Sequence, residues 1–159
     1  MKRALAVILM LLLASFGRAQ QQQQATATAT TASTMSSADV RFESVDLTVD
    51  PKGQPLAAYQ LEFVADANRV KLVGVEGGDH AAFREPPYYD PAALSQHRVV
   101  VAAFSTSADL PKTVTRVARL HVQISGDGQP QWSAKLIVAS SDKSDSIPAD
   151  VKVSEGAKP

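Results

Sequence analysis

Short segments of alternating apolar and polar residues cover most of the chain beyond residue 44. In the first of them, Val45, Leu47 and Val49 alternate with Asp46 and Thr48. This period of two is typical of β-strands with one buried face. Clusters of Gly, Pro, Asp and Ser separate the segments and predict turns. The β-type segments are residues 45–49, 59–63, 70–75, 98–105, 115–124, 132–138 and 147–153; of these, 98–105 is a continuous apolar run.

Seven or more short strands without a convincing long helix predict an all-β domain. Strands of this length between turns are typical of an antiparallel β-sandwich, and a closed barrel is the alternative. The run 98–105 is the most apolar one after the N-terminal region, and we expect it to be a central strand buried on both faces. We also expect either a bulge or a close backbone approach at Gly74, and a shared apolar face for Trp132, Leu136 and Val138.

The N-terminal region has the pattern of an export signal followed by a linker. Lys2 and Arg3 precede the apolar run 4–16, and small residues flank a cleavage site after Ala19. The run is shorter than the roughly 20 residues that span a bilayer. We therefore expect a cleaved signal peptide at 1–19 and no membrane span after cleavage, with an uncleaved anchor as the alternative. The Gln-, Ala- and Thr-rich residues 20–37 predict a disordered linker, the domain is expected at 38–153, and a disordered tail at 154–159.

Composition and charge narrow the classes of partner. The chain has 16 basic and 16 acidic residues, and loss of residues 1–19 removes three basic ones, which leaves a net charge near −3. This balance argues against nucleic acid or an anionic membrane as the partner. The sequence contains no cysteine, so that neither disulfides nor a lipid-modified cysteine is available. The expected location is exported, either extracellular or periplasmic.

The order of the β-type segments resembles that of the cohesin-like modules of bacterial scaffold proteins, in the superfamily that includes some cellulose-binding modules. The resemblance covers most of residues 40–153. It rests on the Val45-x-Leu47-x-Val49 strand, the strand 58–63, the strand 70–77 before a long loop, and the run 98–105 followed by 117–122. It implies a jelly-roll sandwich that docks a partner module or holds a polysaccharide. The chain has one such module and no dockerin-like segment, and no partner-contact residue carries over by match.

The loop 77–97 contains the candidate binding residues. It combines paired glycines, three prolines in residues 86–91, and the candidates Phe83, Arg84, Tyr88 and Tyr89. Neighbouring residues in an extended stretch point to opposite sides, so that one tyrosine is expected to face out while the other packs down. We consider two interpretations: an aromatic contact surface stiffened by proline, or a lid that packs over a sheet edge.

No catalytic or metal-binding motif accompanies these residues. Asp79, His80, Glu85 and Asp90 share the loop, but their spacing matches no standard metal site, and we predict none. A loosely bound Ca²⁺ is the one cofactor that the sequence leaves open. There is no Gly-x-Ser-x-Gly nucleophile motif and no phosphate-binding Gly-rich loop. The catalytic prediction is therefore also none.

We therefore expect a secreted, non-catalytic binding module that binds a protein partner or a polysaccharide. The alternatives are a dedicated carbohydrate-binding module, or an envelope assembly subunit that associates through an exposed strand edge. An enzyme is the least favoured class. The sequence does not indicate the oligomeric state.

Overall fold

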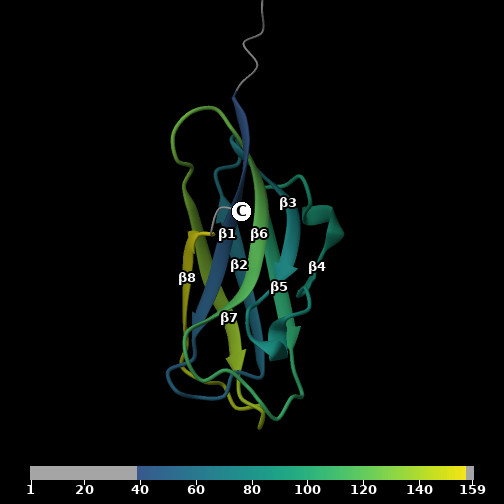
Figure 1. The fold of residues 1–159 in the computed structure, drawn as a ribbon, viewed down its shortest axis with the longest axis vertical. Helices are drawn as coiled ribbons and strands as arrows, with labels where there is room; N and C mark the ends of the chain where they lie inside the picture. Colours follow the sequence, from purple (N-terminus) through teal and green to yellow (C-terminus); the bar gives the residue numbers. More distant parts are fainter. Residues whose placement is uncertain (1–38, 157–159) are drawn as a thin grey trace, which may run out of the picture. The chain divides into compact units, whose positions relative to one another are not determined.

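The computed structural model describes residues 39–156, which form two stacked antiparallel sheets (Figure 1). Sheet A has the strand order β3-β6-β1-β8, and sheet B has the order β4-β5-β2-β7. This arrangement confirms the predicted all-β antiparallel sandwich. The strands are β1 (Val40–Asp50), β2 (Ala58–Ala65), β3 (Val70–Gly77), β4 (Tyr88–Tyr89), β5 (Arg98–Phe104), β6 (Thr115–Ser125), β7 (Trp132–Ser140) and β8 (Asp150–Glu155).

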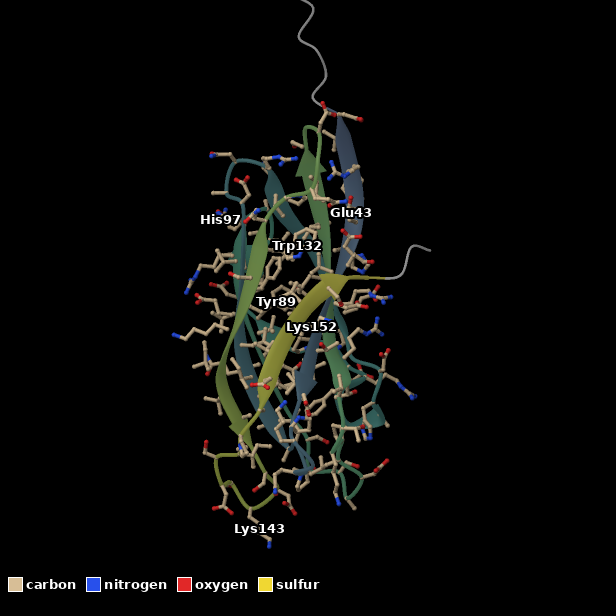
Figure 2. The ribbon with its side chains drawn as sticks, turned by 90° about the vertical axis from the view of Figure 1, so that its left-hand side faces the viewer. Glu43, Tyr89, His97, Trp132, Lys143 and Lys152 are labelled. Atoms are coloured by element: carbon tan, nitrogen blue, oxygen red, sulfur yellow. The ribbon has the colours of Figure 1, made fainter. Side chains whose placement is uncertain are left out.

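The core lies between the two sheets and is built by the alternating apolar residues of each strand. Figure 2 views the sandwich from the edge that β7 and β8 form, and Tyr89 and Trp132 lie between the sheets. Burial of these apolar side chains is the main stabilising term, because no disulfide contributes. The largest fully buried side chains include Phe63, Leu47, Leu56, Leu61, Leu72, Leu120 and Ile124.

Three register shifts interrupt the pairing of the described strands. One lies between β1 and β6, where Val117 of β6 is the additional residue. Another lies between β3 and β6, where Val73 is the additional residue, which confirms a bulge next to Gly74. The third lies between β2 and β7, where Ile137 is the additional residue. A bulge reverses the alternation beyond it. Leu136 therefore packs against the core whereas Val138 is exposed, and the prediction that the two share an inward face is wrong.

The strand β5 was expected to be buried on both faces, and this prediction is wrong. Its inward residues Val99 and Val101 are fully buried. On the opposite side, Val100 and Ala102 are only partly buried, and Phe104 is 69% exposed. The reason is that no described element packs on the outer face of sheet B, so the apolar residues on that side of β5 remain at the surface.

The domain ends slightly later than expected. The strand β8 extends to Glu155 and pairs with β1 up to Val45, so that residues 154 and 155 belong to the sheet and not to a tail. The proposed signal peptide and linker lie outside the described residues. Among residues 39–156, no helix has the length and apolar character needed to cross a membrane.

Candidate functional site

The loop between β3 and β5 is held in place by local hydrogen bonds and by one short strand. His80 accepts a hydrogen bond from the Ala82 amide at 3.2 Å and caps the 3₁₀ helix η1 (Ala81–Phe83). Asp90 accepts one from the Ala92 amide at 2.9 Å and caps η2 (Pro91–Ala93). Between these helices, β4 pairs with part of β5 and forms the short edge strand of sheet B.

The four candidate residues of this loop do not form one surface. Phe83 is 2% exposed and packs edge-on against the ring of Tyr59, with 5.2 Å between the ring centroids. Phe83 is therefore a core residue and cannot contact a partner. The two tyrosines point to opposite sides as predicted: Tyr89 packs against the core and Tyr88 is 76% exposed. Arg84 is exposed.

Tyr88 belongs to a larger surface that the sequence analysis did not identify. Tyr88 of β4 pairs with Ala102 of β5. Ala102 pairs in turn with Gln60 of β2, which pairs with Val138 of β7. These pairs place the four residues in one row across the outer side of sheet B. The row joins strands that are far apart in the sequence into a continuous face.

Large apolar side chains collect on this side of sheet B. Phe104 lies two residues along β5 from Ala102 and so faces the same way. On β7, Ile137 is 48% and Val138 is 44% exposed. Of the eight large apolar residues that are exposed in residues 39–156, four lie here. We call this surface the apolar face and define it by Tyr88, Val100, Ala102, Phe104, Ile137 and Val138.

Polar residues border the apolar face. The Arg98 guanidinium donates a hydrogen bond of 2.6 Å to the Glu62 carboxylate across β5 and β2. Lys135 is exposed on β7, in the row that contains Glu62 and Val100. Gln60 lies within the face, between Ala102 and Val138, so that the surface mixes apolar and polar groups. Such a mixture is typical of protein-binding surfaces, whereas a row of rings in a groove is typical of sugar binding.

The outer side of sheet A has a different chemistry. Arg119 donates two hydrogen bonds, of 2.7 and 2.9 Å, to the carboxylate of Asp46, and Arg116 lies 3.5 Å from the same group. Arg116 also pairs with Asp79, and His121 lies 2.9 Å from Glu76. Asp46, Asp79, Arg116 and Arg119 thus form a network of ion pairs on this side of the sheet. The Nε atom of Arg116 and the Nε2 atom of His121 are buried without a hydrogen-bond partner among the described residues.

We expect Asp46→Asn to lower the free energy of unfolding at pH 7 by about 1–3 kcal/mol, because it removes a partly buried charged acceptor. The hydrogen bonds from Arg119 hold the pKa of Asp46 below its usual value. A lowered folded-state pKa stabilises the fold above the unfolded pKa, and the contribution is lost as the pH falls below about 4. The variant should therefore lose less stability between about pH 4 and pH 2. Urea unfolding over this range measures both effects.

A matched control for this prediction is Asp150→Asn. Asp150 pairs with Lys52 at 2.7 Å, but its side chain is 74% exposed. Such surface pairs contribute roughly 0–1 kcal/mol. Equal effects of the two substitutions would show that the Asp46 network is no more stabilising than an ordinary surface pair.

Three of the candidate metal ligands of the loop, Asp79, His80 and Asp90, have structural partners. Asp79 pairs with Arg116, while His80 and Asp90 cap the two short helices. Within residues 39–156, no three His, Cys, Asp or Glu side chains lie close enough together to hold a metal ion. A hollow of about 570 Å³ lies where the turn 51–55 meets the loop 141–148, and it is lined largely by exposed polar side chains.

Phe104 is the main residue that sequence reasoning missed. Its position after Val100 and Ala102 at intervals of two is the signal that these three side chains share one side of the strand. This signal was not used because both faces of β5 were expected to be buried. Comparison of the chain with models of protein families, with curated proteins and with solved structures gave no match.

Proposed function

We propose that this chain is an exported, non-catalytic module that docks a protein partner through the apolar face of sheet B. The observation that supports this most strongly is the group of exposed apolar side chains that lie together on the outer side of sheet B. Tyr88 and Phe104 are 76% and 69% exposed on that side. Sheet A exposes Val40, Phe42 and Val73, but its outer side also carries the ion pairs of Asp46 with Arg116 and Arg119. Contiguous exposed apolar surface is characteristic of interaction sites.

The geometry of the ends is compatible with this role. The described chain begins in β1 and ends in β8, and both strands belong to sheet A. A connection at either end therefore starts from the sheet opposite the docking surface. The cohesin-like order of segments also supports a non-catalytic binding role, since the resemblance implies a module that docks a partner or holds a polysaccharide.

The proposal is tested by capture of partners from the host's secreted fraction with the purified protein, followed by affinity measurement of each partner. Phe104→Ala and Tyr88→Ala should each weaken binding at least tenfold, because central aromatic residues contribute most of the energy of such interfaces. Both side chains are exposed, so the variants should fold with unchanged stability.

Phe42→Ala is the matched control. Phe42 is 68% exposed, nearly the same as Phe104, but lies on the outer side of sheet A. The substitution should leave the affinity for the captured partner unchanged.

A glycan array measured in parallel tests the alternative that the module binds a polysaccharide. Glycan binding that Tyr88→Ala abolishes, without any captured protein, would replace the protein-docking proposal, and equal effects of Phe42→Ala and Phe104→Ala would contradict it.

A further inference from the structure

We infer that the occupant of the apolar face is a second copy of this chain, with sheet B of one copy stacked on sheet B of the other. This inference rests on the proposed docking function and names its partner. The argument depends on how the rows of sheet B match when the sheet is placed against itself. Most soluble homodimers have a twofold axis, so that each residue i facing j requires j facing i.

A twofold axis parallel to the strands, between β5 and β2, gives a complementary match. It places β4 over β7 of the second copy and β5 over β2. Tyr88 then faces Val138, and Phe104 faces Ala58, which is its register partner on β2. Tyr88 and Phe104 thus each meet a smaller apolar side chain, as close packing of two sheets requires. In the same arrangement Ala102 faces Gln60, and Val100 faces Glu62, whose carboxylate keeps its hydrogen bond from Arg98 of its own copy.

The same axis brings together opposite charges at the border. Lys135 lies in the row of Glu62 and Val100. Continuation of the β4–β5 register beyond Tyr89 places Asp90 in that row, and alternation after Tyr88 directs it outward. Lys135 of one copy therefore faces Asp90 of the other, twice in the dimer. Asp90 uses one carboxylate oxygen to cap η2, and its second oxygen is available.

A twofold axis perpendicular to the strands gives a poorer match. Centred on the row of Gln60, it would place Lys135 over Ser140, so that Lys135 would face no acidic side chain. Association through the edges of sheet B is also disfavoured. The edge strand β4 has only two residues, and Lys135 stands on the edge strand β7. The charges therefore favour face-to-face association about the parallel axis.

The test measures the oligomeric state of the purified protein, in the form that accumulates in the cell. Sedimentation velocity is recorded at protein concentrations from about 1 to 100 µM. We expect a monomer–dimer equilibrium. Lys135→Glu and Asp90→Lys should each weaken dimerisation at least tenfold, because each creates two like-charge contacts. An equimolar mixture of the two variants should recover heterodimers with nearly the wild-type affinity, because both contacts then pair opposite charges.

Lys152→Glu is the control, since Lys152 is exposed on β8 of sheet A and should not affect dimerisation. Asp90→Lys also removes the cap of η2, so the fold of this variant is checked by circular dichroism and urea unfolding. If Asp90→Lys does not fold, the test rests on Lys135→Glu and Tyr88→Ala. A protein that stays monomeric, or a dimer that these substitutions leave unchanged, would overturn the inference. If a different protein is captured through Tyr88 and Phe104 while the chain remains monomeric, the docking function stands and only the second copy is excluded.

Discussion

Phe83→Ala should lower the free energy of unfolding by about 3–5 kcal/mol, the usual cost of removing a buried aromatic side chain. The ring of Phe83 is 2% exposed and packs edge-on against Tyr59. The Tyr59 hydroxyl donates a hydrogen bond of 2.9 Å to the carbonyl of Val117, across the sandwich in β6. Loss of the Phe83 ring therefore leaves a cavity beside a contact that joins the two sheets. Urea unfolding monitored by circular dichroism measures the effect.

Tyr88→Ala is the control for this prediction because it removes an aromatic side chain five residues away in the same loop. Tyr88 is 76% exposed, and its removal should change stability by no more than about 0.5 kcal/mol. The two substitutions therefore separate the structural and binding roles of the loop. If Phe83→Ala were as stable as Tyr88→Ala, Phe83 would not be a core residue and would not anchor the loop to the sandwich.

The strands were predictable because their apolar residues alternate over several positions. In β1, Val45, Leu47 and Val49 are all fully buried, as the pattern indicated. The opposite poses of Tyr88 and Tyr89 followed from the same rule. Such local regularities survive in the fold wherever a strand pairs without interruption.

The errors arose where a distant part of the chain determines the outcome. The alternation in β7 predicted that Val138 faces inward, but the bulge at Ile137 depends on the pairing with β2. Phe83 is buried because the loop folds back against Tyr59, a contact 24 positions away in the sequence. Phe104 is exposed because nothing described covers sheet B. The apolar face combines three strands whose order cannot be inferred from local pattern.

The paired glycines at the start of the loop have a structural reason that the sequence did not reveal. A Cβ on Gly77 would overlap the backbone carbonyl of Arg84, and one on Gly78 would overlap that of Arg116. The amide of Gly78 donates a hydrogen bond of 2.6 Å to the carbonyl of Phe83. The neighbouring Asp79 amide donates one of 3.0 Å to the carbonyl of Arg116 in β6. The chain thus passes between two backbone segments with no space for a side chain.

Gly78→Ala should therefore destabilise the fold by about 3 kcal/mol, at the upper end of the cost of overpacking, because the obstructing atoms are backbone and cannot turn aside. Gly74→Ala is the matched control in the adjoining strand β3. A Cβ there would meet the His121 side chain at 3.6 Å, an ordinary contact, and the change should be small or slightly stabilising. Urea midpoints of the two variants give the comparison. Because Gly78 anchors the loop that carries β4, its replacement should also weaken binding through Tyr88, whereas Gly74→Ala should not. Equal midpoints for the two variants would contradict the close backbone approach and, with it, the fixed position of Tyr88 on the apolar face.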